Sequence, residues 1–263
     1  MIMSVLFRCA KALVRFGALV NLPSEEVQET PLHIAAKHGL YDHLHLYLRY
    51  GATVDKKNSL EETALSVACR EAKNMENQES YLQVCKLLLA YGADVNTVDE
   101  EIKTPLHKAC RNTNHGLVQL LLQRQADVNA IDYNGAYPMS CVLQAAAFKQ
   151  ELKPHLTVQT LLNHGSQKIW PTAFVKVLKS CASVPEIIEM LYNSYPHLPI
   201  SEKWVEVIPK EDFQVGSDPL EASPWLLSGS RFLGGSATPM LRQRQRQPMR
   251  FKLPFKFINC GTR

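Results

Sequence analysis

One seven-residue phrase occurs three times in this chain and limits what the chain can fold into. The copies are Thr30-Pro31-Leu32-His33-Ile34-Ala35-Ala36, Thr63-Ala64-Leu65-Ser66-Val67-Ala68-Cys69 and Thr104-Pro105-Leu106-His107-Lys108-Ala109-Cys110. The first two copies begin 33 residues apart, and the second and third begin 41 residues apart. A phrase that returns with a period of about 33 residues indicates stacked helical repeats, in which each unit packs mainly on its neighbours.

Each copy is followed by a leucine-rich stretch and then by a turn of small residues. The turns lie at residues 50–55, 91–96 and 124–129. We expect two helices per repeat, with threonine capping the first helix and proline, in two of the copies, in its first turn. Glycine in a left-handed conformation should end the second helix. Gln125 replaces that glycine in the third turn, and we expect it to be strained there.

The spacing also predicts where the repeats depart from a regular length. The longer second period places about eight extra residues between the two helices of one repeat, in the polar run 70–79. Tyr137-Pro138-Met139-Ser140-Cys141 is a degenerate fourth copy, and a second extended segment follows it at 148–156. A more degenerate unit begins at Trp170-Pro171.

The T-P-L-H-x-A phrase resembles the signature of ankyrin repeats. The resemblance implies an all-α ankyrin-repeat solenoid, with stacked helix pairs and β-hairpin loops, that binds proteins. We assign residues 1–21 to a partial repeat whose first helix is missing at a truncated N-terminus. About four repeats should follow in 22–165, then a degenerate helical repeat and linker in 166–214. A disordered basic tail should occupy 215–263.

Composition argues against several classes of function. No stretch approaches the roughly 18 apolar residues of a membrane span, so we expect no membrane contact. The 7 cysteines form no C-x-x-C pair and no metal-ligand spacing. No nucleophile motif, phosphate-binding loop or carboxylate pair is recognisable, so we expect neither an enzyme nor a cofactor.

The cysteines and histidines of the repeats fit structural roles. Cys69, Cys110, Cys141 and Cys181 fall on apolar helical positions, which indicates buried thiols in a reducing compartment. We therefore expect a cytoplasmic protein, with the nucleus as the alternative. His33 and His107 should hydrogen-bond the backbone of neighbouring loops. No third residue orients His107 and Cys110 as a catalytic dyad.

The composition of the chain changes near its end. After Glu221 there are eight basic residues and no acidic one. Glycine, serine and an alternating Arg-Gln run at 242–247 predict disorder. Charge alone would let such a tail contact nucleic acid. Few aromatic residues there could stack on bases, so we expect solvated disorder rather than a nucleic-acid partner.

Residues 12–214 resemble the ankyrin repeat and SOCS box family. The resemblance rests on the enlarged repeat ending at 81–89 and on later segments at 161–165, 170–171, 184–189 and 204–209. It implies a substrate-recognition subunit, an adaptor of a RING ubiquitin ligase built on elongin B/C and cullin-5. Such a protein acts in the ubiquitin conjugation pathway and in intracellular signal transduction.

The ligase-recruiting part of that family pattern is not recognisable after Gln214. The SOCS box needs a leucine four residues before a cysteine to fill the elongin C pocket, and here Lys256 precedes Cys260 at that distance. We therefore expect this polypeptide not to bind elongin B/C. The alternative function is an ankyrin scaffold that binds a basic protein independently of ubiquitin.

Acidic residues precede successive copies of the phrase, where the expected hairpins would gather them at the loop tips. They are Glu25, Glu26, Glu61, Glu62, Asp99, Glu100, Glu101 and Asp132. Two interpretations stay open. The acids form a solvated rim, or they form a surface that binds a basic protein substrate.

Two asparagines end D-V-N turns, with a leucine eight residues before each. These are Asn96 and Asn129. One interpretation is structural, because asparagine tolerates turn conformations and bonds neighbouring backbone. The other is hydroxylation by the asparaginyl hydroxylase that modifies many ankyrin repeats, which requires local opening of the turn.

Overall fold

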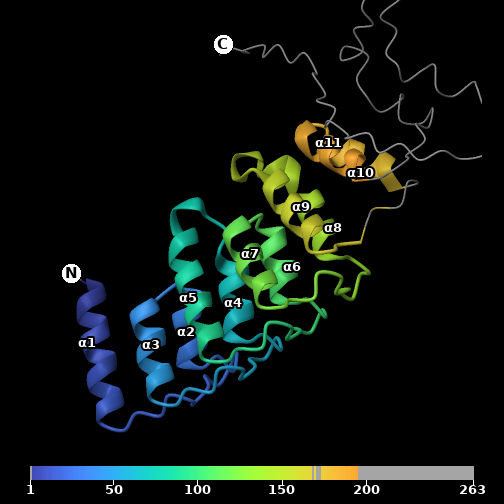
Figure 1. The fold of residues 1–263 in the computed structure, drawn as a ribbon. Coiled ribbons are helices and arrows are strands. Elements are labelled where there is room, and N and C mark those ends of the chain that lie inside the picture. Colours follow the sequence, from blue (N-terminus) through green and yellow to red (C-terminus); the bar gives the residue numbers. More distant parts are fainter. Residues whose placement is uncertain (1, 168, 170–172, 195–263) are drawn as a thin grey trace, which may run out of the picture. The chain divides into compact units, whose positions relative to one another are not determined.

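Pairs of helices make up the part of the chain that this computed structural model describes, residues 2–167, 169 and 173–194. The first helices of the pairs are α2 (Pro31–Lys37), α4 (Ala64–Glu71), α6 (Pro105–Arg111), α8 (Pro138–Ala145) and α10 (Phe174–Cys181). The second helices are α3 (Tyr41–Arg49), α5 (Gln78–Ala90), α7 (His115–Gln123), α9 (Pro154–Asn163) and α11 (Pro185–Asn193). A single helix, α1 (Ile2–Arg15), precedes them. Successive pairs lie side by side in the order of the sequence (Figure 1).

The helices form two parallel rows. Each first helix packs against the first helix of the next repeat, from α2 through α10. The second helices form the other row, and α1 extends it by packing on α3. The predicted stack of helix pairs is therefore confirmed, and α10 and α11 continue it.

The phrase residues explain why the first helices can approach closely. Their small side chains are almost completely buried in the row, as Ala36, Ala68 and Ala109 show. Between the rows lies a continuous core of leucines that are at most 1% exposed. Its members are Leu32, Leu44, Leu65, Leu88, Leu106, Leu117, Leu121, Leu161 and Leu191. Cys69, Cys110, Cys141 and Cys181 are free and buried, as predicted.

The two long connections within repeats lie where the sequence predicts them. The first holds a short 3-10 helix, η1 (Met75–Asn77), and part of the insertion lengthens α5 to 13 residues. The second holds two 3-10 helices, η2 (Ala146–Phe148) and η3 (Gln150–Leu152). Both connections join the C-terminal end of a first helix to a second helix.

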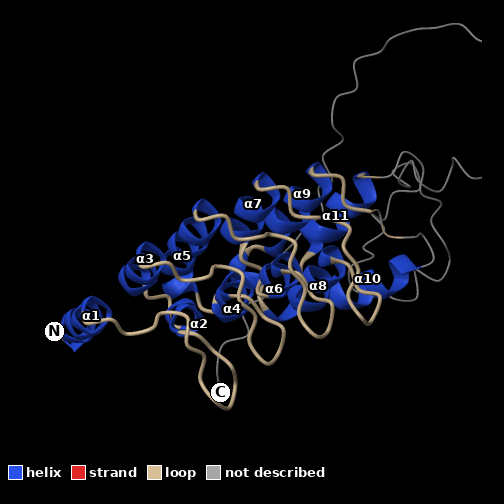
Figure 2. Ribbon diagram, turned by 90° about the horizontal axis from the view of Figure 1, so that it is seen from below, coloured by secondary structure: helices blue, strands red, loops and turns tan. Residues whose placement is uncertain are grey.

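Four loops project from the opposite end of the first helices, and we call them the fingertip loops: residues 22–30, 55–63, 96–104 and 129–137. They lie next to one another along the row of first helices (Figure 2). Two backbone bonds close the tip of each of the last three, such as Asn58 N–H to Glu62 O and Glu61 N–H to Asn58 O, both at 3.0 Å. Both bonds lie within one tight turn and do not extend into a ladder, so the loops are hairpin-shaped turns without strands within the described residues.

The turns that end the second helices have the expected backbone conformation. Gly51, Gly92 and Gly165 have φ values of 81°, 87° and 84°. Gln125 occupies the same place with φ 65°, so the expected strain of a non-glycine residue is present. A bond from Ala126 N–H to Leu121 O, at 3.0 Å, closes its turn in the manner of a Schellman motif.

One position after these turns bridges each repeat to the next. Asn21, Asn96 and Asn129 occupy it, and each side-chain oxygen accepts a backbone N–H from the following turn at 2.7–2.8 Å. Each side-chain amide also donates to a carbonyl of that turn, at 2.9–3.3 Å. Asp55 holds the fourth such position, and its carboxylate only accepts, from Asp94 N–H at 3.2 Å.

We expect Asp55→Asn to raise the free energy of unfolding by about 0.5–1.5 kcal/mol, the usual net value of one hydrogen bond. The new amide would donate to a carbonyl of the next turn, and it would remove a carboxyl whose pKa burial raises. Urea unfolding measures the change. The matched variant Asn96→Asp should lose a similar amount, and equal stability of Asp55→Asn and the parent chain would contradict this account of the bridge.

Several predictions fall on residues outside the described part of the chain. These are the basic tail, the linker beyond residue 194, the Trp170-Pro171 phrase and the expected lack of a SOCS box. The domain boundaries therefore stay predictions. None of the helices in the described residues has the length and apolar character needed to cross a bilayer.

Candidate protein-binding surface

A polar side chain at the start of each tip holds the last three fingertip loops in shape. Asn58, Asp99 and Asp132 each accept two backbone N–H groups of their own loop, at 2.8–3.0 Å. In the first loop Glu25 takes this place, and Ser24 Oγ accepts Glu29 N–H instead, at 3.1 Å. The side chains of Asp99 and Asp132 therefore stabilise their own loops.

The loops are also tied to one another. Backbone bonds run from Ser59 N–H to Val27 O at 3.1 Å and from Tyr133 N–H to Glu101 O at 2.9 Å. A third bond, from the N–H of residue 100 to the carbonyl of residue 60, joins the two middle loops at 3.3 Å. The four tips therefore form a continuous, cross-linked edge.

The histidines of the phrase anchor the loops to the first helices, as predicted. Thr30 N–H donates to His33 Nδ1 at 3.2 Å, so the ring proton lies on Nε2, which donates to Glu62 O at 3.0 Å. His107 makes the equivalent bond to Ala136 O at 3.1 Å. Burial lowers the pKa of both rings, although the bound carbonyls act in the opposite direction. Both rings are therefore neutral and hydrogen-bonded at both nitrogens, as is typical of histidines with a structural role.

The eight acids predicted at the loop tips divide into two groups. Glu25, Glu26, Glu61, Glu100 and Glu101 are exposed. Glu62 and Asp132 are only 3% and 6% exposed, and the side chain of Asp99 is 8% exposed. The prediction of an exposed acidic surface therefore needs correction at Glu62, Asp99 and Asp132, which are turned inward by bonds that the sequence pattern does not reveal.

Cations reduce the acidic surface further. Lys57 pairs with Glu61 at 3.0 Å, and Lys103 pairs with Glu101. Within the described residues, no salt bridge involves Glu25, Glu26 or Glu100. These three carboxylates supply most of the free negative charge of the tips.

A buried ionic cluster explains two of the inward-facing acids. Lys108 Nζ donates to Glu62 Oε1 at 2.6 Å, to Asp99 Oδ2 at 2.7 Å and to Ser66 Oγ at 2.7 Å. Burial alone would raise the pKa of Asp99, but the bonds from Lys108 and from the backbone of its loop outweigh burial and lower it. The cluster joins two first helices to two fingertip loops.

Large apolar side chains also lie exposed on the fingertip loops, at least one near the tip of each. Val27, Leu60, Ile102 and Tyr133 are 46%, 41%, 46% and 78% exposed. Together with the five exposed acids they form the surface that we call the fingertip ridge. The apolar residues were missed in the sequence analysis, although valine, leucine, isoleucine and tyrosine in turns otherwise rich in polar residues were visible there.

Comparison with known protein families identifies the kind of repeat that these helix pairs form. A family model of ankyrin repeats matches three overlapping ranges, 2–99, 32–132 and 75–173. This chain belongs to the ankyrin-repeat family. The long inter-helix connections are insertions into ankyrin repeats, and the fingertip ridge is the edge formed by the loops between successive repeats.

Relatives of this ankyrin array confirm the predicted resemblance to ankyrin repeat and SOCS box proteins. This chain is 51% identical to ankyrin repeat and SOCS box protein 18 of Homo sapiens over 207 residues, which are 79% of this chain and 44% of the relative. It is 40% identical over 201 residues to protein 16 of the same series from Homo sapiens, 76% of this chain and 44% of the relative. Protein 10 from Mus musculus is 38% identical over 216 residues, 80% of this chain and 46% of the relative. The chain spans less than half the length of these relatives.

Asn96 and Asn129 lie in the ankyrin array at the bridges between repeats, and both of their side-chain polar atoms are bonded to the next turn. A hydroxylase would have to break these bonds to reach the side chain. Asn21 makes the same pair of bonds, although it does not end a D-V-N turn. Hydroxylation stays a prediction.

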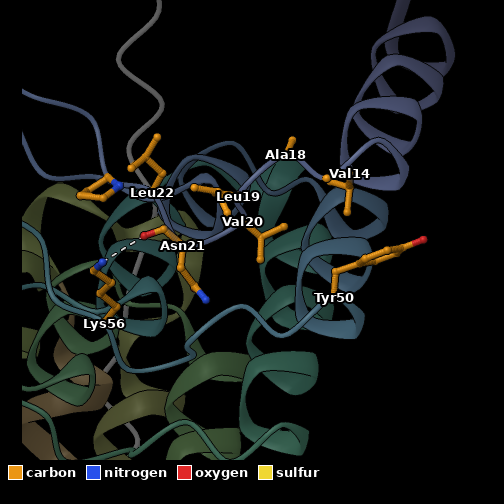
Figure 3. Close-up of a pocket in the computed structure, with 10 residues that line it drawn as sticks. Val14, Ala18, Leu19, Val20, Asn21, Leu22, Tyr50 and Lys56 are labelled. Atoms are coloured by element: carbon orange, nitrogen blue, oxygen red, sulfur yellow. Dashed lines mark hydrogen bonds between the residues drawn. The ribbon is translucent and has the colours of Figure 1, made fainter.

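A pocket of about 630 Å³ lies where α1 leads into the first fingertip loop. It is lined by Val14, Leu19, Val20 and Tyr50, among others, and Lys56 closes one side by bonding Asn21 O at 3.0 Å (Figure 3).

The buried thiols do not form nucleophiles. Burial raises the pKa of Cys141 to about 11 and holds that of Cys110 well above its ordinary value. A protonated, inaccessible thiol is unreactive. Among the described residues, no group of three or more His, Cys, Asp or Glu side chains is arranged to hold a metal ion.

Proposed function

We propose that this chain is the substrate-binding ankyrin part of a ubiquitin-ligase receptor, and that it binds a protein through the fingertip ridge. The observation that carries the proposal is the ridge itself: free carboxylates and exposed apolar side chains on loops bonded to one another and to a rigid helix stack. Binding sites on loops positioned by a rigid scaffold are common in proteins.

The charge of the ridge favours a basic partner. Glu25, Glu26 and Glu100 have no salt bridge within the described residues, so a basic protein can pair with them without breaking an internal contact. Exposed pairs contribute about 0–1 kcal/mol each, so affinity must come from several contacts together with the apolar residues.

The ligase connection rests on the relatives, whose printed names include the SOCS box. In such a receptor the ankyrin stack would hold a substrate while elongin B/C and cullin-5 bind elsewhere. Because no leucine and cysteine in the required spacing follow Gln214, this polypeptide by itself should bind substrate without recruiting elongin C. The free, buried cysteines favour a cytoplasmic location.

The alternative is a scaffold that binds the same kind of basic protein and has no connection with ubiquitin. Co-purification separates the two. A form of the protein that carries a SOCS box should bring down elongin B/C and cullin-5 together with the substrate, whereas a ubiquitin-independent scaffold should bring down the basic partner alone.

Charge reversal on the ridge tests the binding surface. The triple variant Glu25→Lys, Glu26→Lys and Glu100→Lys should weaken binding of the co-purified partner about tenfold at low salt, and less at 1 M salt, where the Debye length falls to about 3 Å. The control triple variant reverses Glu76, Glu79 and Glu151, exposed acids at the other end of the helices. Equal losses in both triple variants would show that only net charge matters and that the ridge is not the site.

A further inference from the structure

The residue at the turn of the third fingertip loop has a conformation that does not suit its side chain. Ile102 has φ 59°, in the left-handed region. The corresponding residues of the other three loops, Gln28, Glu61 and Gly135, also have positive φ values, of 53°, 57° and 74°, so the turn itself sets this conformation. Glycine enters this region freely, whereas a β-branched residue there is an outlier.

Burial does not explain why an isoleucine occupies this turn. The side chain of Ile102 is 46% exposed, so about half of its apolar surface faces solvent in the free protein. Strained residues that persist on a surface tend to lie at sites of function, and the inference runs from the observed outlier to a role. A role in contacting a partner would account for an exposed β-branched residue in a turn that does not suit it.

The neighbours of Ile102 extend this contact surface along the stack. Leu60 lies on one adjacent loop and Tyr133 on the other, and both are exposed. Backbone bonds of 3.3 and 2.9 Å tie these two loops to the loop of Ile102. The free carboxylate of Glu100 is on the same tip. An apolar row with acids beside it therefore crosses three repeats, on loops that lie next to one another (Figure 2).

We propose that this row docks an extended basic segment of the protein partner, with Ile102 as the central apolar anchor. The proposal rests on the function proposed above and adds the chemistry and the shape of what is bound. Lysine or arginine of the segment would face Glu100 and the acids of the first loop. Apolar side chains of the segment would contact Leu60, Ile102 and Tyr133.

The distance between neighbouring loops limits which backbone conformation the bound segment can have. Neighbouring packed helices lie about 8–10 Å apart, so the tips of neighbouring loops recur at about that distance. A polyproline II segment rises about 3.1 Å per residue and returns to the same face every third residue, about 9 Å further on. The bound segment should therefore carry apolar residues at every third position, with basic residues between them.

Peptide selection tests this inference. The full chain is used to enrich a phage-displayed library of random 12-residue peptides, and the affinities of the enriched peptides are measured for the parent chain and for Ile102→Gly. We expect enriched peptides with the basic, three-residue pattern, and about tenfold weaker binding to Ile102→Gly, the size of an interface hot spot. The thermal midpoint of Ile102→Gly should rise, because glycine relieves the left-handed strain.

Gln125→Gly is the matched control, because it relieves the same kind of strain at φ 65° in a helix-ending turn away from the ridge. It should raise the thermal midpoint and leave peptide binding unchanged. Failure to enrich any peptide, enrichment of acidic peptides, or equal binding by Ile102→Gly and the parent chain would each overturn the inference. If the protein partner still binds and responds to charge reversal on the ridge, the proposed function stands without the anchor.

Discussion

Replacing Lys108 with methionine is expected to lower the free energy of unfolding by about 3–5 kcal/mol, the usual cost of breaking a buried ion pair from one side. Lys108 is 7% exposed and pairs with both Glu62 and Asp99. Without it, Asp99 would be a buried carboxylate with no cation, and Glu62 would keep only Arg70, at 3.3 Å. Equilibrium urea unfolding followed by circular dichroism measures the loss.

Two further variants make the test specific. Lys57→Met removes a lysine whose partner Glu61 is exposed, and it should cost less than about 1 kcal/mol. Adding Glu62→Gln and Asp99→Asn to Lys108→Met removes both buried carboxylates that have lost Lys108 and should recover part of the stability. A loss of under 1 kcal/mol for Lys108→Met alone would mean that the cluster does not hold the loops to the helices.

Cavities created in the second row of helices should lower the free energy of unfolding nearly as much as the loss of Lys108. Leu88→Ala in α5 or Leu121→Ala in α7 should each destabilise the array by about 2–5 kcal/mol, because both side chains are fully buried and packed helices close such a space only in part. Leu156→Ala is the control, since Leu156 in α9 is 42% exposed and should change stability by about 0.5 kcal/mol or less. Unchanged urea midpoints for both buried leucines would contradict the observed packing of the second row.

The sequence predicted the helix stack because each repeat carries its own local signals. Threonine and proline mark where the first helices begin, and glycine with φ near 80–90° marks where most second helices end. The insertions in the second and fourth copies were visible as extra residues between two such signals. Contacts between neighbouring repeats follow from the period, so the packing was predictable as well.

The candidate site was less predictable because its decisive contacts join distant positions. Lys108 occupies a variable position of the phrase, and its partner Glu62 is 46 residues away. Nothing in the local pattern distinguishes Glu62, which is buried, from Glu61, which is exposed. The conformation of Ile102 was also hidden, since the sequence shows the residue type but not the sign of φ.

Photo-crosslinking at two aromatic positions of one repeat tests most directly whether the fingertip ridge binds the partner. Tyr133, 78% exposed on the fourth fingertip loop, and Phe148, 85% exposed beyond the other end of α8, are each replaced by benzoylphenylalanine. The account predicts that the protein partner crosslinks at position 133, through a basic segment identified by mass spectrometry, and not at position 148. Crosslinking at position 148 with none at position 133 would contradict it.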